Sequence, residues 1–208
     1  MSVVHVPSSP RWPLFGMMMA LGIYVLVLGL FVSLHKPVEA NGTAAPRISH
    51  VSASGIYSLQ GTRTTLLDGK RGALLLLMAP WCKYCAYEDA YVIPRLAHLS
   101  GITFDVVDVS NRGGFANPGP VHPAFSGHDQ IGAPLSLPGR ERVMRQYRAR
   151  FGLMGPNEQV VVAKPSQWPV TSYPTWVFVS SRGQILRVLP GAVTKPQMDS
   201  LLKEILKS

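Results

Sequence analysis

The sequence predicts an α/β fold in which a central mixed sheet is flanked by helices, preceded by one transmembrane helix and interrupted by an insertion rich in proline and glycine. Three observations support this prediction: an apolar strand at 73–78 that runs into the only two cysteines of the chain, a β-branched strand at 102–109, and a charge-free apolar segment at 13–34. A strand, a helix and a further strand in this order are typical of a right-handed βαβ unit with parallel strands.

The apolar segment 13–34 has no charged side chain. At about 1.5 Å per residue it can cross a hydrocarbon core of about 30 Å, and it is longer than a typical signal-peptide core of about 7–15 residues. We therefore expect a tail at 1–12, an uncleaved anchor in the lipid bilayer at 13–34, a linker at 35–50 and a folded domain at 51–208. This signal-anchor layout, and the persistence of disulfides outside the cytoplasm, place the domain on the extracytoplasmic face of the cytoplasmic membrane.

The formal net charge is +9, but the basic residues are scattered apart from one cluster that precedes a glycine. No nucleic-acid motif accompanies this cluster, so we expect no nucleic-acid partner and interpret the cluster as a solvated basic helix face. Its members are Arg140, Arg142, Arg145, Arg148 and Arg150.

The domain is expected to begin with short strands or edge pieces at 55–59 and 64–67, with a turn at Asp68-Gly69. The apolar run 73–78 lies between Gly72 and Pro80. Its length and composition predict a strand that is buried on both faces.

The two cysteines, Cys82 and Cys85, follow this strand and open a stretch without Gly or Pro. Cys82 is therefore expected at a helix N-terminus, where unpaired N–H groups stabilise its thiolate, with the Lys83 cation beside it. Cys85 is placed to close a disulfide with Cys82 or to resolve a mixed disulfide. A structural zinc site is disfavoured because no second pair of ligands exists. Pro94 should end or kink the helix at Ile93.

The segment 111–139 contains several prolines and glycines and is too long for a plain connector, which predicts an ordered surface excursion or a mobile flap. A helix at 140–151, with Gly152 as its C-cap, follows. The remaining elements are predicted from alternation, turn residues and helical periodicity. They are a short strand at 159–163, a strand opened by Pro174, a hairpin partner at 185–189 and a helix at 197–207.

With these elements the chain resembles the thioredoxin superfamily. The resemblance depends on Trp81-Cys82-Lys83-Tyr84-Cys85 after a strand, Tyr173-Pro174-Thr175 before another, and Gly183 in the hairpin. The lead-in at 57–72 is similar to the membrane-anchored, extracytoplasmic TlpA-like branch. The resemblance covers roughly 55–110 and 140–206, and the insertion at about 111–139 lies outside it.

The resemblance implies a thioredoxin fold with a four- or five-stranded sheet, and a redox-active Cys82–Cys85 disulfide without any other cofactor or metal. Cys82 would be the exposed nucleophile and Cys85 the resolving thiol. It further implies a cis peptide at Pro174 that presents the Tyr173 backbone to an extended client. The residues expected to bind the client are Trp81, Tyr84, Tyr173 and Pro174.

The sequence departs from thioredoxins proper in two ways. Leu76 occupies the position of their buried acid, so the carboxylate that would help to move the Cys85 proton is missing. The pair Lys83-Tyr84 replaces their Gly-Pro between the cysteines. Since Lys83 and the helix terminus both favour the reduced, thiolate form, we expect an oxidising couple.

The predicted function is that of a membrane-anchored thiol–disulfide oxidoreductase. Its partners would be protein thiols or disulfides of exported clients and a separate electron-transfer partner. One alternative is a copper-binding assembly chaperone of thioredoxin fold, in which the two cysteines and His122 or His128 hold Cu(I). A second is a non-catalytic assembly factor that uses the insertion as a binding arm.

Overall fold

The computed structural model describes residues 54–66, 69–96 and 99–205. The expected tail at 1–12, anchor at 13–34 and linker at 35–50 lie outside these residues. Within the described part of the chain, no helix combines the length and the apolar character needed to cross a membrane.

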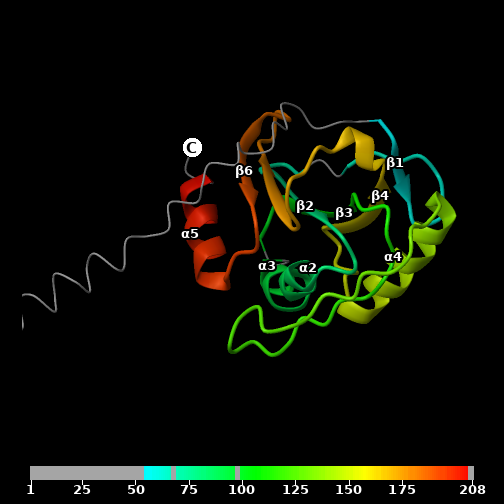
Figure 1. Ribbon diagram of the computed structural model, residues 1–208. Coiled ribbons are helices and arrows are strands. Elements are labelled where there is room, and N and C mark those ends of the chain that lie inside the picture. The colour runs from blue at the N-terminus through cyan, green and yellow to red at the C-terminus, as the bar shows by residue number, and fades with distance from the viewer. Residues whose placement is uncertain (1–53, 67–68, 97–98, 206–208) are drawn as a thin grey trace, which may run out of the picture. The chain divides into compact units, whose positions relative to one another are not determined.

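A mixed sheet in the order β1-β4-β3-β2-β5-β6 forms the centre of the domain (Figure 1). The expectation of four or five strands is therefore wrong, because the described residues form a sheet of six. The short segment 159–163 extends it: this strand pairs with both β3 and β1. The strands are β1 (Ile56–Ser58), β2 (Gly72–Met78), β3 (Ile102–Asp108), β4 (Glu158–Ala163), β5 (Thr175–Val179) and β6 (Ile185–Pro190).

The predicted parallel βαβ unit is present: β2 and β3 pair in parallel, with Leu76 opposite Val106. β3 pairs in parallel with β4, while β2–β5 and β5–β6 are antiparallel. The predicted strand at 64–67 is not formed over its described residues, 64–66; just before them, Arg63 makes an isolated bridge to Tyr57. This leaves β1 as a short edge strand beside β4.

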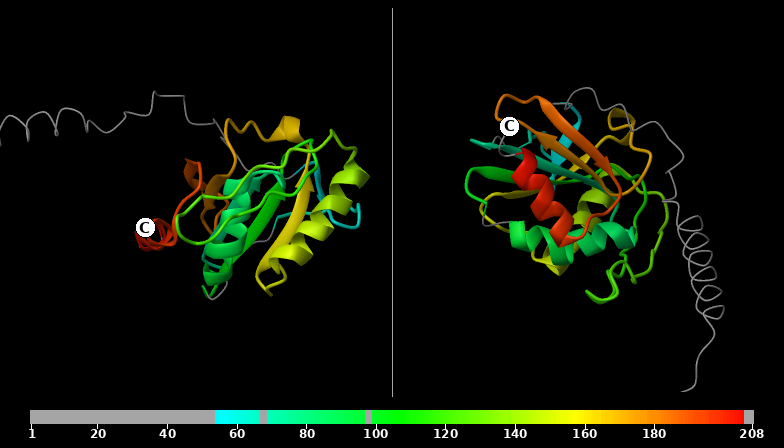
Figure 2. Two further views of the ribbon diagram at one scale, coloured as in Figure 1. Left: turned by 60° about the horizontal axis from the view of Figure 1, so that its bottom comes forward. Right: turned by 90° about the vertical axis from the view of Figure 1, so that its left-hand side faces the viewer.

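Every residue of β2 is buried, as its apolar run predicts. Because successive side chains of a strand point to opposite faces, the strand serves two cores. Leu74, Leu76 and Met78 belong to one core, which also contains side chains from the helix after the cysteines and from the helices at 137–151 and 195–205. Ala73, Leu75 and Leu77 belong to a second core, which includes Trp168. Figure 2 shows these helices gathered beneath the sheet.

The helix after the cysteines runs as α2 (Lys83–Tyr87), a π-helical turn η1 (Glu88–Val92) and α3 (Ile93–Leu96). Of the two outcomes expected at Ile93, an end or a kink, the helix does not show the end, because it continues as α3. The π turn, in which the Ile93 amide bonds the Glu88 carbonyl, lies just ahead of Pro94. Pro94 consequently falls in the first turn of a new α-helical segment, where its missing N–H costs little.

The insertion is an ordered excursion of two antiparallel arms, in agreement with one of the two expected forms. Bridges join Arg112 to Pro134 and Asn117 to His128. Its glycines permit this close approach: a Cβ at Gly127 would lie 1.9 Å from the Asn117 carbonyl oxygen. In Figure 1 the excursion, in green, passes beside α2 and α3.

Helix α4 (Leu137–Phe151) begins earlier than expected, so the insertion ends before 137 rather than at 139. Gly152 adopts the left-handed conformation at its C-cap, φ 66 and ψ 27, as predicted. The described chain continues with the 3-10 turn η2 (Pro165–Gln167) and closes with α5 (Lys195–Ile205). In α5, Met198 and Leu202 are buried against the sheet core.

The interpretation of the arginine cluster as a solvated face is wrong for Arg140. This side chain is buried and forms an ion pair with Asp108, with 2.9 Å between Nη2 and Oδ2. It also donates to the carbonyl oxygen of Ala163 at 2.9 Å. Arg142, Arg145 and Arg150 are exposed. Arg140 could not be distinguished from them in the sequence, because its ion-pair partner, Asp108, lies on the distant strand β3.

Candidate active site

The two cysteines lie where β2 ends and α2 begins. Cys82 is the N-cap of α2, with extended backbone angles of φ −87 and ψ 121, and its Sγ accepts a hydrogen bond from the Cys85 amide at 3.4 Å. Both thiols are free. This is the helix-start position that the sequence predicts for Cys82.

The loop before β5 meets Cys82 from the other side. The Cys82 thiol donates to the Tyr173 carbonyl oxygen at 3.6 Å, and the Tyr173–Pro174 peptide is cis, as the resemblance implied. The ring of Trp81 packs edge-on against that of Tyr173, with 5.5 Å between centroids. The structure therefore brings together Trp81, Cys82, Tyr173 and Pro174 from two distant parts of the chain.

Tyr84 is more peripheral than the other expected client-binding residues. It is 38% exposed and packs edge-on against Phe125 of the insertion, with 5.5 Å between centroids. Because of this exposure, Tyr84 belongs to the rim of the site. Its contact with Phe125 shows that the insertion contributes to this rim.

Trp81 is held in place by a chain of hydrogen bonds that leads to a buried ion pair. Its indole Nε1 donates to Ser110 Oγ at 2.9 Å, and the Ser110 amide donates to Asp108 Oδ1 at 2.9 Å. Asp108 in turn pairs with Arg140 of α4. Burial raises the pKa of Asp108 to about 6, although the Arg140 charge acts against this rise. The buried ion pair thus sets the position of the tryptophan beside the cysteines.

Cys82 is not the exposed residue that the resemblance implied. It is 3% exposed, and Cys85 is 0% exposed. The Tyr173 carbonyl lies 3.6 Å from the Cys82 sulfur and contributes to this burial. Cys82 is nevertheless the more exposed of the two cysteines.

The two thiols differ in acidity. Hydrogen bonding from the Cys85 side chain lowers the pKa of Cys82, and hydrogen bonds from the Cys85 and Tyr84 amides lower it further. Burial acts in the opposite direction. Burial raises the pKa of Cys85 well above its ordinary value, and its hydrogen bond to Cys82 raises it further. A low-pKa thiol followed by a high-pKa thiol suits a nucleophile followed by a resolving group.

Two buried carboxylates lie one turn beyond Cys85, and sequence analysis missed both. Glu88 and Asp89 are each 0% exposed, and their Oε2 and Oδ1 atoms have no hydrogen-bond partner among the described residues. Burial raises the pKa of Glu88 to about 8 and that of Asp89 to about 7. The expectation that Leu76 leaves the site without a buried acid is therefore wrong. The i+3 and i+4 spacing from Cys85 was the available signal, since it puts both acids near the helix face of that cysteine.

The insertion is bonded directly to the cysteine loop. The Ala116 amide donates to the Pro80 carbonyl and the Gln130 amide to the Trp81 carbonyl, both at 3.0 Å. The Lys83 amide donates to Asp129 Oδ1 at 2.7 Å. No sequence signal marked Asp129 or Gln130, because loop residues that meet a site through tertiary contacts leave no local pattern.

The copper alternative is not favoured by the arrangement of possible ligands. Among the described residues no group of three or more His, Cys, Asp or Glu side chains is placed to hold a metal ion. His122 precedes a cis-proline in the insertion, and His128 lies near Gln130, with 3.4 Å between their Nε2 atoms. Neither imidazole joins the cysteines in such a group.

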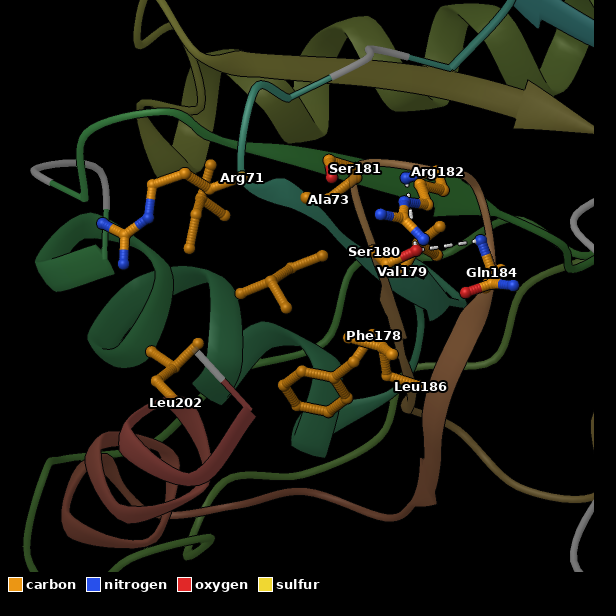
Figure 3. Close-up of a pocket in the computed structure, with 13 residues that line it drawn as sticks. Arg71, Ala73, Phe178, Val179, Ser180, Ser181, Arg182, Gln184, Leu186 and Leu202 are labelled. Carbon is orange, nitrogen blue, oxygen red and sulfur yellow. Dashed lines mark hydrogen bonds between the residues drawn. The ribbon is translucent and has the colours of Figure 1, made fainter. Parts of the chain in front are cut away.

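A cavity of about 500 Å³ lies at the other end of β2. Figure 3 shows it between the start of that strand, the β5–β6 turn and Leu202 of α5. Its walls include Arg71, Gly72 and Phe178. It is separate from the cysteines, which follow the opposite end of the strand.

A cysteine pair between a buried strand and a helix, facing a cis-proline, is the arrangement of thioredoxin-like thiol–disulfide oxidoreductases. The model of the thioredoxin-like domain family matches residues 60–206. The chain therefore belongs to the thioredoxin-like family. Among curated proteins, no significant match to the sequence was found.

Solved structures with a TM-score of 0.50 share this fold at low sequence identity. A thioredoxin-like protein from Aeropyrum pernix is 16% identical, with a TM-score of 0.50, over 72% of this chain and 87% of that one. DsbF from MTB, in mixed oxidized and reduced forms, is 18% identical, with a TM-score of 0.50, over 77% of this chain and 98% of that one. A secreted Mycobacterium tuberculosis disulfide oxidoreductase is 13% identical, with a TM-score of 0.48, over 71% of this chain and 92% of that one.

Proposed function

We propose that the protein exchanges disulfides with exported proteins through the pair Cys82 and Cys85. The observation that carries this proposal is the position of Cys82: its sulfur lies at a helix start and 3.6 Å from the backbone carbonyl of Tyr173, beside a cis-proline. An extended client segment running beside Tyr173 would bring its own sulfur to Cys82, while the backbone of the loop holds it as a neighbouring strand.

The exchange passes through one mixed disulfide. In the reducing direction, the Cys82 thiolate attacks one sulfur of a client disulfide, and the other client sulfur leaves as a thiolate that takes a proton. Cys85 then loses its proton and attacks Cys82, which releases the second client thiol and leaves Cys82–Cys85 oxidised. The oxidising direction reverses each step, and two electrons then pass from the client to the pair. A separate electron-transfer partner restores the starting state.

Asp89 and Glu88 are suited to the second step, in which the Cys85 proton must leave. Both carboxylates are buried, and the charge of Asp89 contributes to the raised pKa of Cys85, which places Asp89 near that thiol. A carboxylate with a pKa near neutrality can take up and release a proton at working pH. Their position supports a role in moving the Cys85 proton.

The membrane anchor at 13–34 and the extracytoplasmic position of the domain are part of the proposal. They follow from the length and apolar character of that segment and from the need of a stable disulfide for an oxidising compartment. The full chain should remain with membranes after alkaline extraction, and a chain that lacks 13–34 should not. A membrane-impermeant thiol reagent should label Cys82 in intact cells; labelling only after lysis would contradict this orientation.

Trapping of clients tests the exchange itself. Cys85→Ala in the full chain should accumulate adducts that are released by reductant, because the resolving thiol is gone. The matched control is the double variant Cys82→Ala, Cys85→Ala, in which the adducts should disappear. Equal adducts in both variants, or none with Cys85→Ala alone, would overturn the proposal.

A further inference from the structure

The return arm of the insertion places one carboxylate at the start of the cysteine helix. Asp129 Oδ1 accepts from the Lys83 amide at 2.7 Å, and the next residue, Gln130, donates its amide to the Trp81 carbonyl at 3.0 Å. The bridge between His128 and Asn117 holds the preceding residue of this arm. Asp129 is thus fixed by backbone contacts on both sides of it.

Two acidic groups consequently share the free N–H groups of one helix start. The first amides of a helix have no partner within it and favour a negative charge. The Cys85 amide donates to the Cys82 sulfur, while the Lys83 amide is taken by Asp129. The Asp129 carboxylate accepts the hydrogen bond of one of these amides and adds a negative charge close to the Cys82 sulfur.

We propose that Asp129 is a positioning residue that sets the redox balance of the cysteine pair: its charge disfavours the Cys82 thiolate and so shifts the equilibrium from the dithiol toward the disulfide. The link is thermodynamic, because a dithiol is stabilised by whatever stabilises its thiolate. Asp129 therefore opposes the oxidising tendency that Lys83 and the helix terminus give to the pair. This inference rests on the proposed redox function of Cys82 and Cys85.

The other groups that face Cys82 do not duplicate this effect. The Cys85, Tyr147 and Tyr173 side chains all have raised pKa values and are uncharged at neutral pH. The Lys83 ammonium lies over the Tyr84 ring, 5.0 Å from its centroid. Burial raises the pKa of Cys82 and the Asp129 charge raises it further, against the lowering by hydrogen bonds. Asp89 acts on Cys85.

The variant Asp129→Asn tests the charge alone, since its side-chain oxygen can still accept from the Lys83 amide. In the full chain we expect the pKa of Cys82, followed by its alkylation rate against pH, to fall. The equilibrium with glutathione should move about threefold toward the dithiol, which is about 14 mV in potential. High salt should shrink the difference, because Asp129 is exposed.

Asp199→Asn is the matched control, because Asp199 forms an exposed ion pair with Lys195 on α5, away from the site. It should leave both the alkylation profile and the glutathione equilibrium unchanged. Asp129→Ala separates charge from structure: if the residue served only to hold the insertion, Ala would alter both readouts and Asn neither. That pattern, or an unchanged pKa and equilibrium in Asp129→Asn, would overturn the inference.

The inference and the proposed function can fail separately. Client adducts on Cys85→Ala with no redox effect of Asp129→Asn would remove the inference alone. A shifted Cys82 pKa without any client adducts would remove the proposed function and leave the electrostatic role of Asp129 in place.

Discussion

The Tyr147 hydroxyl donates to Asp89 Oδ2 at 2.6 Å, which ties α4 to the helix that carries the cysteines. Both residues are fully buried, and the ring of Tyr147 stacks on Phe115 at the start of the insertion. Three segments far apart in sequence therefore converge behind Cys85. The bond also holds down the pKa of Asp89, which burial alone would raise further.

Tyr147→Phe should lower the free energy of unfolding by about 1–3 kcal/mol, because a buried carboxylate oxygen loses its donor. Urea denaturation measures the change. Tyr84→Phe is the control, since the Tyr84 ring lies at the exposed rim, and it should change stability by less than about 0.5 kcal/mol. Equal stabilities of the two variants would contradict the assigned role of the bond.

Glu88→Gln should flatten the dependence of stability on pH. The folded-state pKa of Glu88 is raised to about 8 from an ordinary 4.5, so the folded protein binds the proton more tightly than the unfolded chain. Its contribution to stability is then fully present below 4.5 and is lost as pH rises through 8. Wild-type protein should unfold at a lower urea concentration at pH 8 than at pH 5. If the free energy of unfolding of Glu88→Gln changed with pH as steeply as that of the wild type, the prediction would be contradicted.

Arg140→Met should destabilise the domain by about 3–5 kcal/mol, because Asp108 would be left as a buried, uncompensated acid. It should also loosen Trp81, whose indole is held through Ser110 by the same network. Denaturation and tryptophan fluorescence report the two effects. Arg142→Met removes an exposed arginine of the same helix and should leave both nearly unchanged.

Alkylation of the reduced protein should separate the two cysteines. Cys82, with its lowered pKa, should react with iodoacetamide below the pH at which ordinary thiols react, whereas Cys85 should stay unmodified while the domain is folded. Mass spectrometry of the modified chain identifies the site. In denaturant the two rates should become similar; equal rates in the folded protein would contradict the assigned order of attack.

The strand–cysteine–helix unit was predictable because each part has a local signal. Each signal is carried by residues that are adjacent in the sequence: the apolar run of β2, the absence of Gly and Pro directly after Cys85, and the turn before β6. The cis peptide at Pro174 was expected from the resemblance, not from local chemistry. The additional strand β4 was also visible as a β-branched run, although its pairing with both β1 and β3 was not.

The path of the cysteine helix past Pro94 was only partly predictable: an end or a kink was expected at Ile93, and the helix switches to a π turn before Ile93 and then continues as α3. That switch depends on how the helix packs, and packing is decided by residues elsewhere in the chain. For the same reason the sequence could not show that Arg140, unlike the other arginines of its cluster, is buried in an ion pair.

The sequence by itself determined that a cysteine pair would follow a buried strand and open a helix, because hydrophobic runs and helix starts are local properties of the chain. Only the tertiary structure decided which charges would surround that pair. Asp129 reaches the start of the cysteine helix through the folded insertion, and Asp89 acts on Cys85 from a buried helix face. Electrostatic effects depend on distance through space and on exclusion of water, and folding sets both.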